Sequence, residues 1–303
     1  YVGTVSIPVL RALAFKHLME NKTICISEDE LIVGERGERP QSTPTYPELC
    51  CHSLDDFDLI HNREKISFDV SMRVRNIQKD EIIPFWENKA IRCKIFKEMS
   101  SEWKDCYQAG IFTEFMEQRA PGHTVADGKI YQNGFLDFKE KIEKEINRLD
   151  FYNDTEAYEK HEELKAMKIC CGAIIKFGQR HAERAEELAK KEKNIKRKKE
   201  LLNIAEVCNR VPAHKPRNFW EALQMYWFVH LGVITELNTW DSFNPGRLDQ
   251  HLYPFYKKEI EEEVLTEKKA KELLQCFWVK FNNQPAPPKV GVTLEESGTY
   301  TDF

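Results

Sequence analysis

Apolar residues recur at helical spacing along most of the chain. The first series follows Ser6, Ile7 and Pro8 and comprises Val9, Leu10, Leu13, Ala14 and Leu18. A serine cap with proline in the first turn is a typical helix start, so this pattern predicts a helix over about residues 8–20. The same spacing predicts helices over residues 88–99, 101–109 and 136–149, one or two long helices from 155 to about 208, and helices over 252–258 and 265–281.

Two short apolar runs lack helical spacing. Residues 30–34 are closed by a glycine, and this pattern predicts a strand or an extended segment. Residues 35–48 contain three prolines and continue neither a helix nor a strand. Residues 290–293 form a second candidate strand, and the proline-containing stretch 211–216 interrupts the long helical region.

The most apolar segment is residues 219–234, with the sequence FWEALQMYWFVHLGVI. It contains Glu221 and His230 and is shorter than a bilayer-spanning helix, so the pattern predicts a helix buried in a protein core. The N-terminal residues lack the basic start, the apolar core and the cleavage site of a signal peptide. We therefore expect neither export nor a membrane partner.

Composition indicates a soluble globular protein. The chain has 303 residues, of which 41% are hydrophobic and 31% charged, and this length suits one large or two ordinary domains. The formal net charge of -5 argues against nucleic acid or an anionic membrane as partner. Residues 189–200 are strongly basic, but nearby glutamates have spacings that allow ion pairs along a helix, so a solvated helix face is the better interpretation.

The cysteine pattern argues against structural zinc and disulfides. Nine cysteines are scattered along the chain, and no C-x-x-C motif occurs among them. An odd number without regular spacing is not typical of a disulfide framework, so we expect a cytoplasmic protein with reduced thiols.

Three stretches combine polar residues with turns. His123 follows Pro121-Gly122, and a residue directly after such a turn has a defined direction, although a histidine there also serves as an ordinary polar contact. Asp241 follows the apolar segment and a tryptophan, so it needs a partner if it is buried; it could instead cap a turn, with Arg247 and Asp249 forming a local ion pair. Ser297 precedes a glycine and could bind a carboxylate or lie in a surface loop.

Several long motifs resemble one enzyme family. They are LIVGERGERPQSTPTYPE, PFWENK, EFMEQRAPGHTV, MYWFVHLGVITELNTWDSFNPGRLDQHLYPFY and VKFNNQPAPPKVGVTLEESGTYTDF. Together they are similar to the N-terminal part of the glycyl radical enzymes, the family of pyruvate formate-lyase and the radical dehydratases. The resemblance covers residues 1–303 and implies a fold: a helical shell with the first strands of a ten-stranded α/β barrel that encloses the reaction.

The resemblance also implies an activity and partners. A radical S-adenosylmethionine activating enzyme installs a glycyl radical, no other cofactor is bound, and the complete protein is a homo-oligomer. The expected reaction is dehydration of a small hydroxylated substrate, with trans-4-hydroxy-L-proline and its product Δ1-pyrroline-5-carboxylate favoured. The alternatives are C–C cleavage of the pyruvate formate-lyase type, glycerol or diol dehydration, and a non-catalytic helical interaction module.

Roles for individual residues follow from their match to the family's motifs. His123 is similar to the residue that protonates the departing hydroxyl, and Asp241 to the acid that fixes the substrate. Ser297 is expected to bind the substrate carboxylate and Asp302 to join the polar network. The apolar walls of the pocket are expected to be Phe115 and Phe303.

The chain departs from the family pattern in two places. The family's thiyl cysteine stands in a Cys-x-Glu motif, and none of the nine cysteines is followed two positions later by glutamate. The C-terminal glycine motif that carries the radical is also missing. We therefore expect this chain to be a fragment or excised domain of a longer enzyme that lacks the radical centre and is inactive alone.

Overall fold

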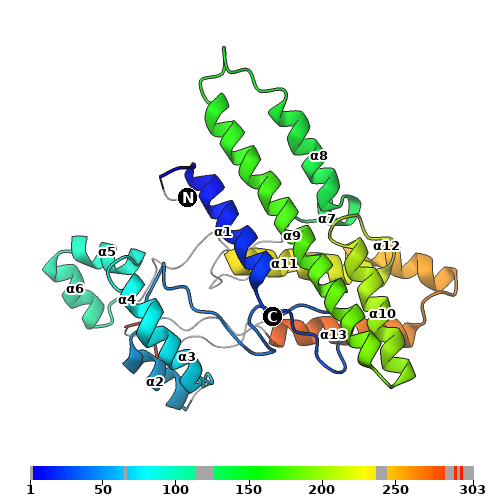
Figure 1. The fold of residues 1–303 in the computed structure, drawn as a ribbon, viewed down its shortest axis with the longest axis horizontal. Coiled ribbons are helices and arrows are strands. Elements are labelled where there is room, and N and C mark those ends of the chain that lie inside the picture. The colour runs from blue at the N-terminus through cyan, green and yellow to red at the C-terminus, as the bar shows by residue number, and fades with distance from the viewer. Residues whose placement is uncertain are drawn as a thin grey trace. The chain divides into compact units, whose positions relative to one another are not determined.

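The computed structural model describes residues 3–64, 67–112, 126–236, 244–283, 290–291 and 294–295. Within these ranges the regular elements are helices, and no β-strand is formed (Figure 1). The chain divides into two compact units. Unit 1 comprises the described residues of 1–40, 123–236 and 244–281, and unit 2 those of 41–122, 237–243 and 282–303.

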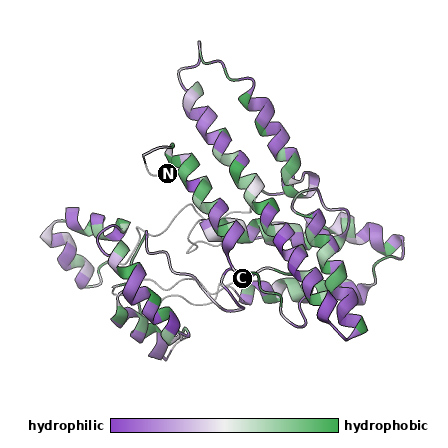
Figure 2. Cartoon of the chain, viewed as in Figure 1, coloured by the Kyte–Doolittle hydropathy of each residue, from purple (hydrophilic) through white to green (hydrophobic). Residues whose placement is uncertain are grey.

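Unit 1 is built around the long helix α9 (Ala157–Lys191). Helices α1 (Ile7–Asn21), α8 (Phe135–Ile146) and α10 (Ile195–Arg210) pack against it, as Figure 1 shows. The short helix α7 (Lys129–Gln132) and helices α12 (Leu248–Glu261) and α13 (Glu267–Asn282) complete the unit. Hydrophobic and hydrophilic residues are mixed along these helices (Figure 2), as in amphipathic helices that bury one side.

The core of unit 1 is helix α11 (Phe219–Glu236), in which 14 of the 18 residues are buried. Aromatic rings from two other helices surround it. Phe177 of α9 lies 5.7 Å from Phe228, and Phe281 of α13 lies 5.2 Å from Trp227, both measured between ring centroids. No helix of sufficient length and apolarity to cross a membrane occurs among the described residues. The prediction of a buried core helix is confirmed.

Residues 30–36 cross α11 without forming a strand, so the strand alternative for 30–34 is wrong for this described segment. Its backbone groups bond to side chains instead of a neighbouring strand. The amide of Gln224 accepts from the N–H of Val33 and donates to its carbonyl, both at 2.8 Å, and the indole N–H of Trp227 donates to the carbonyl of Gly34 at 2.9 Å. Gly34 has φ +119°, and a Cβ there would lie 2.7 Å from Leu231, so only glycine fits.

Unit 2 contains short helices and little core. They are α2 (Leu54–Asn62), α3 (Met72–Ile77), the π-helical turn η1 (Gln78–Ile82), α4 (Ile83–Trp86), α5 (Ile91–Glu98) and α6 (Ser101–Gln108). One small cluster joins Phe57, Ile60 and Leu294, and another joins Tyr46, Leu49, Cys50 and Val290. Helices α3, α4 and α5 bury no residue.

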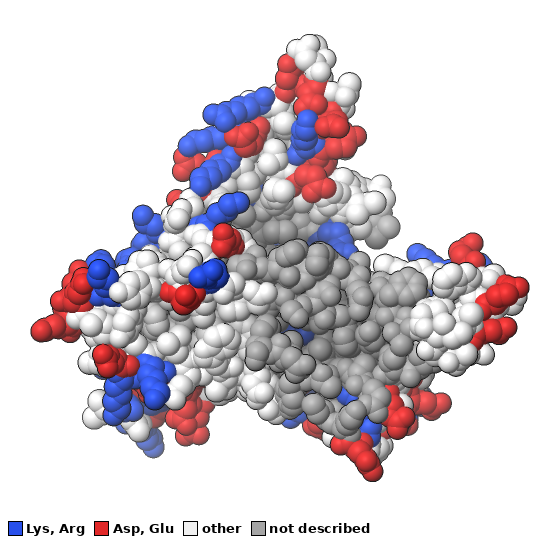
Figure 3. All heavy atoms as spheres, turned by 180° about the vertical axis from the view of Figure 1, so that it is seen from behind, with Lys and Arg blue, Asp and Glu red and all other residues white. Residues whose placement is uncertain are grey.

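Most predicted helices are confirmed, with ends shifted by a few residues. Helix α2 was missed, although Ser53 and Asp56 form a capping box at its start. The basic run 189–200 contains the break between α9 and α10 and is mostly exposed, as predicted. Arg197 is the exception among its charged residues, because it is buried and donates to the carbonyls of Ser27 and Glu30 at 2.9 Å. On the face drawn in Figure 3, basic and acidic side chains are interspersed over the described residues.

Candidate active site

All six predicted site residues lie outside the part of the chain that the structure describes. They are Phe115, His123, Asp241, Ser297, Asp302 and Phe303. The structure nevertheless describes residues that border two of these segments. The segment with His123 is followed by Ala126, and the segment with Asp241 lies between Glu236, the last residue of α11, and Asn244.

The C-terminal end of α11 is held by two arginines from unit 1. Arg36 donates from Nη2 to the carbonyl of Ile234 at 3.2 Å. Arg11 of α1 donates to Oε1 of Glu236 from Nε at 2.9 Å and from Nη2 at 2.5 Å. Cations at the C-terminus of a helix interact favourably with its unpaired carbonyl groups. The residue that precedes the Asp241 segment therefore has a defined position in unit 1.

The start of α12 and the residues after the His123 segment are joined to each other. The N–H of Gly246 donates to Oδ1 of Asn244 at 2.8 Å, which forms a turn before α12. On the first turns of α12, Nε2 of His251 donates to Oδ1 of Asp127 at 3.0 Å. The predicted local ion pair is also present, with Nε of Arg247 3.8 Å from Oδ1 of Asp249, both side chains being exposed.

Buried polar side chains continue along α11 toward these ends. The hydroxyl of Tyr226 and Nδ1 of His230 are 3.2 Å apart, and the His230 ring stacks on Trp227 at 5.3 Å. Burial lowers the pKa of His230 to about 3, and the positive charge of Arg36 acts in the same direction. His230 is consequently neutral at physiological pH. The buried hydroxyl of Tyr131 has no hydrogen-bond partner among the described residues, and burial raises its pKa.

A buried ion cluster, which the sequence reasoning missed, fastens residues 30–35 to α13. Nζ of Lys280 donates to Oε1 of Glu35 at 2.5 Å and also to Oε1 of Glu30. Burial by itself lowers the pKa of Lys280, but the two carboxylates more than reverse this and hold it above its ordinary value. Burial raises the pKa of Glu35, against the opposing effect of Lys280. The cluster links residues 30–35 to α13 and so holds this segment.

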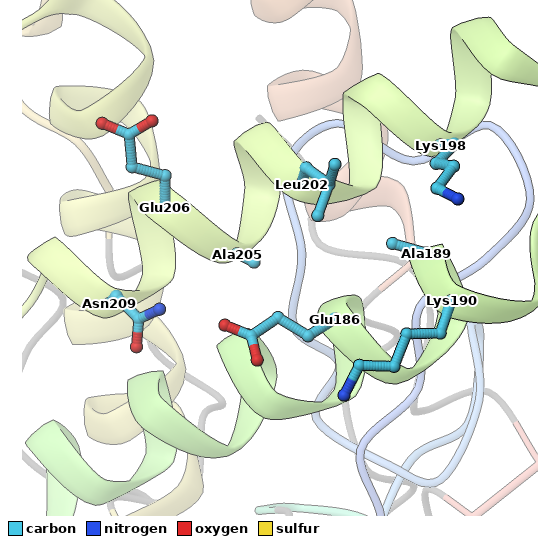
Figure 4. A pocket seen from close by; sticks show the side chains of 8 residues that line it. All are labelled: Glu186, Ala189, Lys190, Lys198, Leu202, Ala205, Glu206 and Asn209. Carbon is cyan, nitrogen blue, oxygen red and sulfur yellow. The ribbon is translucent and has the colours of Figure 1, made fainter.

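A groove lies between α9 and α10 at the surface of unit 1 (Figure 4). It has a volume of about 500 Å³ and is lined by Glu186, Ala189, Lys190, Lys198, Leu202, Ala205, Glu206 and Asn209. The lining contains no histidine, cysteine or hydroxyl side chain, and its glutamates and lysines are exposed to solvent. No metal-binding cluster of His, Cys, Asp and Glu occurs in the described ranges either. The groove is not the candidate active site.

Comparison with known proteins assigns the family. The family model described as pyruvate formate lyase-like matches residues 1–303. The chain belongs to this family. The resemblance noted in the motifs is therefore confirmed, and it extends over the whole sequence.

Individual relatives agree with this assignment. The chain is 58% identical over 303 residues to the trans-4-hydroxy-L-proline dehydratase of Clostridioides difficile, covering 100% of this chain and 38% of that protein. It is 35% identical over 282 residues to the isethionate sulfite-lyase of Oleidesulfovibrio alaskensis, covering 89% of this chain and 34% of that protein. The chain thus spans little more than a third of the length of these relatives.

Solved structures give the same result. The crystal structure of the C. difficile hydroxyproline dehydratase with trans-4-hydroxy-L-proline bound matches with a TM-score of 0.93 at 58% identity, over 100% of this chain and 38% of that one. The glycerol-bound form of the B12-independent glycerol dehydratase from Clostridium butyricum matches with a TM-score of 0.85 at 27% identity, over 99% of this chain and 38% of that one. The described fold is therefore that of the corresponding portion of glycyl radical dehydratases.

Proposed function

We propose that the intact protein containing this chain is a glycyl radical dehydratase that converts trans-4-hydroxy-L-proline to Δ1-pyrroline-5-carboxylate. One observation carries the proposal: identity of 58% over all 303 residues to a dehydratase named for this substrate, against 35% to an isethionate sulfite-lyase. The match covers all 303 residues and therefore spans the segments with His123, Asp241 and Ser297. These segments carry the motifs that resemble the family's substrate site.

In this proposal the chain contributes the helical shell and the first strands of a ten-stranded α/β barrel. The thiyl cysteine and the radical glycine belong to other parts of the protein, because no cysteine here has the Cys-x-Glu context. The activating enzyme that installs the radical is a partner, the intact protein is a homo-oligomer, and its compartment is the cytoplasm. The radical supplies the hydrogen abstraction that starts the reaction.

Each candidate residue has a chemical role in the proposed dehydration. The imidazole of His123 gives a proton to the departing hydroxyl, so the C–O bond breaks with release of water instead of hydroxide. Asp241 accepts a hydrogen bond from the substrate and favours the protonated imidazole. Ser297 donates to the substrate carboxylate and Asp302 extends the polar network, while the rings of Phe115 and Phe303 exclude water from the radical.

Dehydration of a diol is the second candidate function. Structures of a propanediol-dehydrating enzyme of Roseburia inulinivorans and of the C. butyricum glycerol dehydratase match with TM-scores of 0.88 and 0.85, at 30% and 27% identity. These identities are about half of that to the hydroxyproline enzyme, so we rank this function lower. Cleavage of a C–C bond would need two adjacent cysteines at the barrel centre, and neither Cys50–Cys51 nor Cys170–Cys171 suits that role, since Cys170 and Cys171 lie within helix α9.

A substrate panel tests the proposal. The intact protein is activated under anaerobic conditions and incubated separately with trans-4-hydroxy-L-proline, glycerol, propane-1,2-diol, isethionate, and pyruvate with coenzyme A. We expect Δ1-pyrroline-5-carboxylate from the first and no product from the others. Turnover of a diol alone would support the second candidate, and turnover of none would contradict both.

Replacing His123 tests its role as the proton donor. His123→Gln should lower kcat by about two orders of magnitude, as expected for loss of a general acid, while the glycyl radical signal in electron paramagnetic resonance is retained. His17 is an exposed histidine of α1 and provides the matched control. His17→Gln should leave kcat unchanged, and unchanged kcat in His123→Gln would remove His123 from the mechanism.

A further inference from the structure

The backbone directly after the His123 segment is held in an unfavourable conformation. Ala126 has φ 55° and Asp127 has φ 48°, although neither is glycine. Side chains disfavour this left-handed region by roughly 1 kcal/mol per residue, so consecutive examples persist only where surrounding contacts hold them. One residue that contacts this turn is His251 of α12.

His251 of α12 is enclosed by three contacts from this turn and α7. Its Nε2 donates to Asp127 Oδ1 at 3.0 Å, and the ring of Tyr131 stacks on it with centroids 5.2 Å apart and planes inclined by 24°. Gly128 lies close to the imidazole, where an added Cβ would be 3.3 Å from Cε1 and 3.5 Å from Nδ1. The His251 side chain is only 18% exposed, whereas that of Asp127 is 76% exposed.

The pair joins the ends of two separate segments of the chain. Asp127 lies four positions after His123, and His251 lies ten positions after Asp241, on the helix that follows that segment. Between residues 236 and 244 the Asp241 segment is anchored on one side by α11 and on the other by the turn before α12. The hydrogen bond between Asp127 and His251 therefore fixes the start of the described chain after His123 relative to the helix that follows the Asp241 segment.

We propose that Asp127 and His251 form a positioning pair for the dehydration reaction, fixing residue 126, at which the described chain resumes after His123, relative to α12, the helix that follows the Asp241 segment. The inference rests on the proposed function. Neither residue touches the substrate in this proposal. The carboxylate of Asp127 is largely exposed, so the pair contributes at most about 1 kcal/mol to stability, and its loss should leave folding nearly intact. A general acid displaced by a fraction of an ångström, in contrast, loses much of its effect.

The test uses the intact, activated protein, the single substitutions His251→Ala, His251→Gln and Asp127→Ala, and the double alanine variant. We expect His251→Ala and Asp127→Ala each to lower kcat per glycyl radical by about tenfold, with KM changed by less than about twofold. His251→Gln keeps an N–H donor for Asp127 and should recover most of the loss. The double alanine variant should lose no more than either single variant, because the two side chains act through one hydrogen bond.

Lys257→Ala is the matched control, since Lys257 forms an exposed pair with Glu261 on the same helix. It should leave kcat per radical unchanged. The inference is overturned if the alanine variants at 127 and 251 keep kcat per radical within about twofold of the wild type, or if their loss matches a fall in thermal midpoint and is not recovered in His251→Gln. Failure of the proposed function is seen separately, because the wild type would then not turn over trans-4-hydroxy-L-proline. In that case the ratio of kcat per radical between each variant and the wild type is measured on the panel substrate that the wild type does convert.

Discussion

Two regions of the molecule bury their side chains to very different extents. One is helix α11 of unit 1 together with residues 30–36, and the other is the set of helices in unit 2. Fourteen of the 18 residues of α11 are buried, and the backbone of residues 31–34 is bonded by its side chains. In unit 2, helices α3, α4 and α5 bury none of their described residues, and Trp103 of α6 is 58% exposed.

The difference shows where a substitution has a large effect. The backbone of residues 31, 33 and 34 bonds to specific side chains of α11 in a buried environment, so removing one of these side chains leaves a buried backbone group without its partner. In the helices of unit 2 that bury no residue, water replaces a removed side chain, so the free energy of unfolding changes little. Residues 126, 236 and 244, which border the segments with His123 and Asp241, belong to unit 1.

The largest effect is expected at the buried ion cluster. Lys280→Met should lower the free energy of unfolding by about 3–5 kcal/mol, because Glu30 and Glu35 would remain buried without a cation. Lys269→Met is the control on the same helix, where the pair with Glu272 is partly exposed, and should cost less than about 1 kcal/mol. Equal effects of the two variants in urea unfolding would contradict this assignment.

Removal of the Gln224 amide should have the next largest effect. Gln224→Leu leaves the N–H and the carbonyl of Val33 buried without their partners, so unfolding should become easier by about 2–4 kcal/mol. Gln108→Leu, at the exposed end of α6 in unit 2, should stay within about 0.5 kcal/mol of the wild type. If Gln224→Leu were as stable as the wild type, the side-chain bonds to residues 30–36 would not matter for stability.

Buried histidines of unit 1 should make the free energy of unfolding depend on pH. Burial lowers the pKa of His181 to about 3 from 6.5, so the folded protein keeps it neutral. Its contribution is fully present above pH 6.5 and is lost as pH falls from 6.5 toward 3, since the unfolded chain takes up the proton first. Between pH 7.5 and 5.5 the protonation of His181 in the unfolded chain lowers the free energy of unfolding by about 1.4 kcal/mol, and His181→Phe should remove this contribution. The same pH dependence in variant and wild type would refute the assignment.

The smallest effect is expected for an aromatic residue of unit 2. Trp103→Ala should lower the free energy of unfolding by less than about 1 kcal/mol, because the indole is mostly in water. The comparison is Trp227→Ala in the core of unit 1, where complete burial predicts a loss of about 3–5 kcal/mol. A large loss at Trp103 would show that its exposed face is covered in the intact protein.

Helices with a regular apolar repeat were predictable from the sequence, and those stabilised mainly by local capping were not. Helix α9 repeats small and apolar residues over many turns, so its position follows from spacing. Helix α2 is short and depends on the Ser53–Asp56 capping box, a signal that could have been found three residues apart in the sequence. The apolar run at residues 31–33 is typical of a strand. Its actual hydrogen-bond partners, side chains of α11, could not be read from the local sequence, because they lie about 190 positions away.

The predicted site depended on family motifs and not on local chemistry. Nothing in the sequence near Lys280 distinguishes a buried cation from a surface lysine, since its partners Glu30 and Glu35 are about 250 positions away. Asp127 and His251 are also remote in sequence, 124 positions apart. The assigned roles of His123, Asp241 and Ser297 stay predictions, because these residues lie outside the described ranges.

The most direct test is a crystal structure of the intact protein with trans-4-hydroxy-L-proline bound. The account predicts that the imidazole of His123 and the carboxylate of Asp241 each lie within about 2.6–3.2 Å of polar atoms of the substrate, with the hydroxyl of Ser297 at its carboxylate. Side chains of His123 and Asp241 on separate outer surfaces, with the substrate bound elsewhere, would contradict it.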